Sequence, residues 1–187
     1  MRDDITNKLV HLTKGVDEDS TKHKEEAVVN LESILREKRL RGGNGFIKGG
    51  YLCACFSEAP ISKLSYLLAE NDGEKFKYQP YGIMVDKLWL FEKGGRPVIY
   101  GPANDYDKLP EEMRYRHVRF WLSEQYVVDH SWEREWRIKT DSLEISPECV
   151  TVVVPDRNAK DLFLEKFPGE NWHYIALSDL GVVIDSL

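Results

Sequence analysis

Short β-compatible runs, most of them without a regular helix between them, are the feature of this sequence that most limits its fold. These runs lie at residues 8–13, 51–56, 81–85, 97–100, 133–139, 150–154, 172–177 and 182–184. Successive parallel strands need a crossover, usually a helix, so the pattern argues against a doubly wound parallel sheet. We therefore predict an α+β fold built on a mixed or antiparallel sheet.

Helical periodicity is confined to a few segments, most of which we expect in the first half of the chain. An amphipathic helix of about four turns is predicted from the apolar stripe Ala27, Val28, Leu31, Ile34 and Leu35. A short buried helix is expected at residues 61–68, and Asp156 is predicted to cap a helix that runs to Phe167. Because no repeat or long linker divides the chain, residues 1–187 are expected to form a single domain.

The composition excludes several classes of protein. Hydrophobic residues make up 42% and charged residues 31% of the chain, which rules out a fibre or a disordered tail. We expect no membrane association and a cytoplasmic protein, because no apolar run is long enough for a span and the first residues are too polar for a secretion leader. With 26 Lys and Arg against 32 Asp and Glu, binding to nucleic acid would need a local basic patch.

The three cysteines are expected to be free thiols, because an odd number cannot pair completely and the expected compartment is reducing. Cys53 and Cys55 are spaced to share a metal ion, but we find no convincing second pair of ligands. We therefore interpret them as buried structural residues and assign no metal. The phosphate-binding loop, the nucleophile elbow and the zinc-protease motif are also missing from the sequence.

The segment from Asp129 to Arg137 contains the most unusual pattern. Strand alternation would place Glu133, Glu135 and Arg137 on one face. Two carboxylates about 7 Å apart can meet one ligand, and their repulsion can raise one pKa enough for acid or base chemistry. An exposed ladder of salt bridges, with the tryptophans packed, explains the pattern equally well.

Two other pairs of residues are candidates for ligand contacts. His11 and Thr13 project together from the first predicted strand and offer donors to a ribose or an amide, although a histidine bonded to a carbonyl is an equally good interpretation. Phe56 and Ser57 lie where the second strand ends, and the alternative there is a packed ring and a capping hydroxyl.

Basic residues gather in two segments. Arg41 belongs to the first, around a glycine-rich loop that suits phosphate groups but is also typical of a solvated helix end. The second contains Arg114, Arg116, His117 and Arg119, with aromatic residues through Trp121. Such a mixture suits single-stranded nucleic acid, and it also suits packed aromatic residues at the edge of the core, which is how we interpret residues 118–122.

The order of these segments resembles a known family. His11 within Leu-Val-His-Leu-Thr, then Cys-Phe-Ser-Glu-Ala-Pro at residues 55–60, then Glu-Arg-Glu-Trp-Arg at residues 133–137 together resemble the bacterial ADP-ribosyltransferase fold. The likeness is closest to DarT-type and AbiGi-type phage-defence proteins and covers residues 8 to 140. It implies a split, mixed or antiparallel β-sheet core with flanking helices.

The resemblance also implies a cofactor and roles for individual residues. NAD would be surrounded by His11 on the first strand, Phe56 or Ser57 on the second and Glu135 on a later strand. Glu135 would grip the nicotinamide ribose, and Glu133 would orient or deprotonate the acceptor. Thr13 would contact the cofactor and Arg41 the pyrophosphate. The DarT-type arginine has no clear counterpart here, which leaves a nucleic-acid acceptor in doubt.

The function implied is therefore NAD-dependent mono-ADP-ribosyl transfer by a toxin or anti-phage effector, with a nucleic acid or a protein as acceptor. Two alternatives remain open from the sequence. One is a non-catalytic binding or antitoxin module of a defence system with the same fold, in which the glutamates bind a positive partner. The other is NAD hydrolysis, with water as the acceptor.

Overall fold

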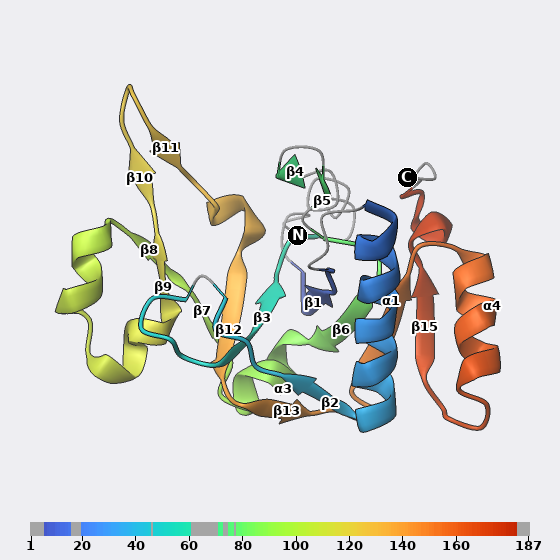
Figure 1. Cartoon of the computed structure of the whole chain (residues 1–187). Coiled ribbons are helices and arrows are strands. Elements are labelled where there is room, and N and C mark those ends of the chain that lie inside the picture. Colours follow the sequence, from blue (N-terminus) through green and yellow to red (C-terminus); the bar gives the residue numbers. More distant parts are fainter. Residues whose placement is uncertain are drawn as a thin grey trace.

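A seven-stranded mixed sheet organises the chain (Figure 1). The structure, a computed structural model, describes residues 6–15, 20–45, 47–60, 71–72, 75–76 and 78–182. Across the sheet the order is β15 (His173–Ala176), β14 (Val150–Val154), β6 (Gly82–Asp86), β1 (Lys8–Leu12), β3 (Cys53–Ser57), β12 (Glu135–Lys139) and β7 (Arg96–Pro97). Only β14 and β15 run parallel in this sheet, so the prediction of a mixed sheet in a single α+β domain is confirmed.

Four two-stranded pairs accompany this sheet within the described residues. They are β2 (Arg39–Arg41) with β13 (Ser142–Glu144), β4 (Asn71–Asp72) with β5 (Lys75–Phe76), β8 (Ile99–Gly101) with β9 (His117–Arg119), and β10 (Trp121–Leu122) with β11 (Val127–Val128). The last pair forms a hairpin that rises away from the body of the protein (Figure 1).

The helices are α1 (Ser20–Glu37), α3 (Lys87–Glu92) and α4 (Arg157–Lys166), with the 3₁₀ segments η2 (Ala103–Lys108), η3 (Glu111–Arg116), η4 (Ser131–Glu133) and η5 (Leu177–Leu180). As predicted, Asp156 caps α4, because its Oδ1 accepts a hydrogen bond of 2.8 Å from the Ala159 amide. Of these α-helices, α1 and α3 lie in the first half of the chain, as expected, and α4 lies in the second. The helix predicted at residues 61–68 and most of the strand at 182–184 lie outside the described residues.

The helices cover one face of the large sheet. Leu31, Ile34 and Leu35 of α1 join the main core cluster, which also takes in Leu90 of α3 and Phe163 of α4. From the strands it receives the side chains of alternate residues, among them Leu9, Ala54, Phe56, Ile83, Val85, Trp136, Ile138, Val152 and Val154. A smaller cluster lies on the opposite face and consists of Val10, Leu12, Ala59, Met84, Val153, Leu177 and Val182. The strands are therefore apolar on both faces near the middle of the sheet.

The interpretation of residues 118–122 as a packed core edge is wrong for Trp121 and Leu122, whereas Val118 and Phe120 are half-buried. Trp121 is 44% exposed and Leu122 is 60% exposed, because both belong to the projecting hairpin. Their apolar character predicts burial, but no other described element covers the hairpin. Packing against the core of this chain therefore does not account for the apolar residues of the hairpin.

Candidate functional site

Three neighbouring strands carry most of the residues singled out from the sequence. His11 lies on β1, Phe56 and Ser57 on β3, and Glu135 is the first residue of β12. The register places Ser57 opposite both Val10 and Glu135, so a single row crosses the three strands. Neighbouring strands are about 4.8 Å apart, which puts the backbones of His11 and Glu135 roughly 10 Å from each other. Segments more than 40 residues apart in the chain thus meet at one place.

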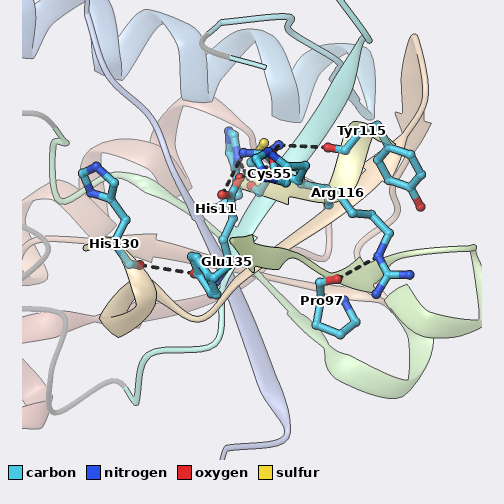
Figure 2. Close-up of polar contacts among 10 residues, drawn as sticks. His11, Cys55, Pro97, Tyr115, Arg116, His130 and Glu135 are labelled. Atoms are coloured by element: carbon cyan, nitrogen blue, oxygen red, sulfur yellow. Dashed lines mark hydrogen bonds and ion pairs between the residues drawn. The ribbon is translucent and has the colours of Figure 1, made fainter. Parts of the chain in front are cut away.

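The junction between β1 and β3 is a seam in the sheet. These strands share a single paired position, Val10 with Ser57, whereas β1 and β6 pair along five. Beyond that position the His11 side chain, and not the backbone, bonds β1 to β3: its Nδ1 lies 2.8 Å from the Cys55 carbonyl oxygen (Figure 2). A carbonyl only accepts hydrogen bonds, so Nδ1 is the donor and Nε2 of the neutral ring is an acceptor. The imidazole thus replaces a backbone hydrogen bond of the ladder.

The pleat divides the candidate side chains between the two faces. Residues opposite each other in a sheet point to the same side, so Ser57 and Glu135 share one face. His11 and Phe56 belong to the other face, under the helices, and their ring centroids lie 5.8 Å apart. The structure therefore brings the strands together but pairs the side chains as His11 with Phe56 and Ser57 with Glu135. A ligand can meet both pairs only at the seam or at the strand ends.

The environment of His11 favours its neutral form. Burial lowers the pKa of the imidazole, the bond to the Cys55 carbonyl opposes that change, and the nearby Lys14 ammonium adds to the lowering. Because the folded pKa lies below the unfolded value of about 6.5, unfolded chains take up the proton first as pH falls. The stability contributed by neutral His11 is therefore complete above pH 6.5 and is lost as pH falls from there through the folded pKa.

We expect His11→Gln to flatten the acid side of the stability profile. The amide of Gln can donate to the Cys55 carbonyl but does not titrate, so the variant should lose less stability than the wild type below pH 6.5. The difference in the free energy of unfolding between the variant and the wild type should change by at most about 1.4 kcal/mol per pH unit. Urea unfolding between pH 8 and pH 5 measures it, with the exposed His173→Gln as the control. Parallel wild-type and His11→Gln profiles would contradict the assigned protonation.

Glu135 is held by a buried arginine from its own strand. Arg137 Nε lies 2.7 Å from Glu135 Oε1, and Arg137 Nη2 lies 3.0 Å from Oε2, a two-pronged bond. Arg137 Nη1 donates in addition to the carbonyls of Tyr115, at 2.8 Å, and His117, at 3.3 Å. The guanidinium thus ties the carboxylate to the segment that runs from η3 into β9. The ladder interpretation predicted this ion pair but placed it in solvent; in the structure the pair is largely buried, with side chains 9% (Arg137) and 15% (Glu135) exposed.

Cys55 and Tyr100 complete the surroundings of Glu135. Burial, and then the neighbouring Glu135 carboxylate, raise the pKa of the Cys55 thiol far above its usual range, so the thiol remains protonated. Burial also raises the pKa of Tyr100 to about 12. The Tyr100 hydroxyl accepts from the Glu135 amide and donates to the His130 carbonyl, both at 3.2 Å. Neither group supplies an anion near neutral pH, and Glu135 is the carboxylate at the centre of this cluster.

Glu133 does not continue the strand, contrary to the prediction. It ends η4, and Arg134 between the two glutamates adopts a left-handed conformation with φ of 46°. The Ser57 hydroxyl donates to the Glu133 carbonyl at 2.6 Å, which fixes this turn beside the end of β3. Non-glycine residues rarely adopt such a conformation, and they do so mainly where surrounding contacts hold them. Glu133 and Glu135 are therefore close along the chain, but η4 positions the first and β12 positions the second.

Thr13 and Arg41 lie apart from this cluster. The Thr13 hydroxyl is buried and shares its one proton between the carbonyls of Ala27, at 2.9 Å, and Tyr81, at 3.0 Å. It thereby connects the end of β1 to α1 and to the residue before β6. Arg41 lies on β2, its side chain is 74% exposed, and it pairs with Glu37 of α1. Its contacts match the solvated helix end that was the alternative for this segment.

Glu58 and Lys87 are site-supporting residues that the sequence analysis missed. The Glu58 carboxylate accepts from Lys87 Nζ at 2.6 Å and from Trp136 Nε1 at 2.7 Å, joining the end of β3 to α3 and β12. Glu58 belongs to the Cys-Phe-Ser-Glu-Ala-Pro segment at residues 55–60 but was given no role there, and Lys87 belongs to no motif that the sequence analysis identified. Only the position of Glu58 directly after Ser57 offered a hint of its role.

The described ranges contain no group of three or more His, Cys, Asp or Glu side chains arranged to hold a metal ion. None of the helices in these ranges combines the length and the apolar character that crossing a membrane requires. No protein-family model, no curated protein and no solved structure matches this chain.

Proposed function

We propose that this protein is an NAD-dependent mono-ADP-ribosyltransferase, with a fold of that type and Glu135 as its central catalytic residue. The observation that supports the proposal is the adjacency of β1, β3 and β12, which carry His11, Ser57 and Glu135 in neighbouring positions. Adjacent strands are what the resemblance implies for these three segments, which are spread over more than 120 residues. Because His11 and Glu135 belong to opposite faces, a ligand would meet both of them at the seam or at the strand ends. In this proposal the protein acts as a toxin or anti-phage effector.

Cleavage of the bond between nicotinamide and ribose requires one carboxylate held in a fixed position. When the bond between nicotinamide and ribose breaks, its electron pair leaves with the neutral nicotinamide and positive charge develops on the ribose. A carboxylate that accepts a hydrogen bond from the ribose 2-hydroxyl stabilises that charge. The acceptor nucleophile then bonds to the ribose carbon, and its proton passes to Glu133 or to water. Glu135 and Glu133 thus have separate roles, as their separate positions permit.

The surroundings of Glu135 fit this role. Its two oxygens offer about four lone-pair positions, and Arg137 occupies one on each oxygen. The side chain is 15% exposed, so a hydroxyl group can still approach the carboxylate. The guanidinium holds the carboxylate in one orientation before any ligand arrives, and such preorganisation is what transition-state stabilisation requires. His11 contributes by joining β1 to β3 at the seam through its hydrogen bond to the Cys55 carbonyl.

Glu135→Gln is expected to lower nicotinamide release and ADP-ribosyl transfer by about 10²- to 10³-fold, the usual loss when one stabilising contact is removed. The assay combines purified protein with NAD labelled in the adenylate part and, separately, single-stranded DNA, RNA or lysate protein. It follows both released nicotinamide and transferred label. Label on one acceptor class identifies the substrate, and free ADP-ribose alone identifies hydrolysis.

Matched variants separate chemistry from folding. Glu144→Gln changes an exposed strand glutamate on β13 and should leave both nicotinamide release and label transfer unchanged. Glu133→Gln should slow transfer to the acceptor more than it slows nicotinamide release. Circular dichroism checks that each variant is folded. A folded wild type that neither binds nor consumes NAD with any acceptor would refute the proposal.

One observation favours a second candidate, a non-catalytic binding or antitoxin module with the same architecture. The Glu135 carboxylate already has a buried arginine as partner, so the pair can serve as a purely structural tie. This candidate predicts no nicotinamide release from the wild type. It also predicts that Glu135→Gln changes stability alone, which the same assay and an unfolding curve distinguish.

A further inference from the structure

One hydroxyl group connects the two ends of the turn that carries Glu133 and Glu135. Tyr100, at the centre of β8, is half-buried, and its hydroxyl donates to the His130 carbonyl, where the turn begins. The same hydroxyl accepts from the Glu135 amide, where β12 begins, and both hydrogen bonds are 3.2 Å long. A residue from a separate strand pair thus fixes the start of this turn relative to its end.

Both hydrogen bonds require the phenol of Tyr100 to keep its proton, and its surroundings favour this. Burial is the main reason that the pKa of Tyr100 is raised to about 12; the carboxylates of Glu135 and Glu133 also raise it, while the bond from the Glu135 amide lowers it. The phenol is therefore neutral near pH 7 and can donate and accept at the same time.

The Glu135 carboxylate does not depend on Tyr100 for its position. Arg137 bonds to both of its oxygens, at 2.7 and 3.0 Å, and the Glu135 carbonyl accepts from the Val98 amide at 3.0 Å. Glu135 is also paired with Ser57 of β3 in the sheet. Removal of the Tyr100 hydroxyl should therefore leave in place the carboxylate that stabilises the ribose.

The position of Glu133, in contrast, depends on His130. Glu133 Oε1 lies 4.0 Å from His130 Nδ1, and the Glu133 amide donates to the His130 carbonyl at 3.1 Å. The Glu133 carbonyl accepts from the Ser57 hydroxyl. Because Tyr100 holds the His130 carbonyl, loss of its hydroxyl leaves the turn attached at Ser57 but free to move at its His130 end.

We infer that Tyr100 is a positioning residue that holds Glu133 beside Glu135, so that the ADP-ribosyl group passes to the acceptor and not to water. This inference rests on the proposed function. In both outcomes the bond between ribose and nicotinamide breaks, and its electron pair leaves with nicotinamide. In transfer, an acceptor O–H or N–H group bonds to the ribose carbon and its proton passes to Glu133. In hydrolysis, water forms that bond and releases its proton to the solvent.

The ratio of transferred label to released nicotinamide tests the inference on the full chain. Tyr100→Phe retains the ring and removes only the hydroxyl. It should lower this ratio about tenfold, because a proton acceptor acts only when it is held in place, and should lower nicotinamide release less than about threefold. A partial loss of folded protein lowers both quantities equally, so a merely structural role would not change the ratio.

Tyr174→Phe is the matched control. Tyr174 lies on β15, at the opposite edge of the large sheet from β12 and β7, and its buried hydroxyl makes no hydrogen bond within the described residues. This change should alter neither nicotinamide release nor the ratio.

A double variant identifies the group through which Tyr100 acts. Tyr100→Phe combined with Glu133→Gln should give the same ratio as Glu133→Gln alone, because the two changes remove one function. A further fall in the double variant would overturn the inference, as would a wild type that hydrolyses NAD without transfer. A wild type that transfers label, with an equal ratio in Tyr100→Phe, refutes the positioning role alone. A wild type that releases no nicotinamide refutes the proposed function and the inference with it.

Discussion

Arg137→Met is expected to lower the free energy of unfolding by about 3–5 kcal/mol, the usual loss when one partner of a buried ion pair is removed. The reason is the position of the guanidinium between Glu135 and two backbone carbonyls. Methionine retains much of the apolar stem but leaves a buried carboxylate without a counter-charge and the carbonyls of Tyr115 and His117 without that donor. Urea unfolding at neutral pH measures the loss.

Arg157→Met is the matched control for this experiment. Arg157 Nε lies 2.8 Å from Asp179 Oδ1, a distance close to that of the buried pair, but the arginine side chain is 79% exposed. Exposed pairs contribute little, so this change should cost less than about 1 kcal/mol. Arg137→Met combined with Glu135→Gln should cost less than Arg137→Met alone, because no unpaired charge then remains buried. Equal losses for Arg137→Met and Arg157→Met would contradict the structural role of the Arg137 cluster.

Gly82→Ala is expected to destabilise the protein by about 3 kcal/mol, the upper end of usual overpacking costs, because the new methyl group would press against β1, the strand that carries His11. A Cβ atom at position 82 would lie 2.1 Å from the His11 carbonyl oxygen and 3.0 Å from the Leu12 Cα. Both are backbone atoms of β1, which cannot turn away as a side chain would. The added methyl group must therefore separate β6 from β1, whose five paired positions anchor the middle of the sheet.

Gly43→Ala serves as the comparison, because among the described residues, Gly43 and its two chain neighbours aside, no atom lies within 4 Å of the position that its Cβ would occupy. Gly43 also has no positive φ, so alanine should be tolerated or slightly stabilising, by about 0.4–1 kcal/mol. Thermal unfolding of both variants gives the contrast. If Gly82→Ala melted at the wild-type temperature, the close approach of β1 and β6 would have to be wrong.

The elements that the sequence predicts well are those whose pattern is local. The stripe of Leu31, Ile34 and Leu35 predicts α1, and these side chains do face the core. Asp156 predicts the start of α4, because a capping carboxylate acts on an amide only three residues further on. In both cases the forces that shape the element act within one or two turns.

The candidate site was predictable only as a set of strands. Alternation correctly places Glu135 and Arg137 on the same face of β12, but it wrongly extends the strand back to Glu133. The turn there depends on the Ser57 hydroxyl, which bonds to a carbonyl 76 residues further on. Likewise, nothing near His11 in sequence indicates that its ring would bond to the Cys55 carbonyl across the seam.

The sequence by itself determined the class of the fold, the main helix and the strands that carry His11, Ser57 and Glu135, because hydrophobic periodicity and capping act over a few residues. The tertiary structure alone decided which strands are neighbours, which face each side chain occupies and that Arg137 holds Glu135. It also decided that Trp121 and Leu122 are exposed, since the same apolar residues would predict burial. These properties depend on contacts between distant segments, whose formation the order of residues within any one segment does not specify.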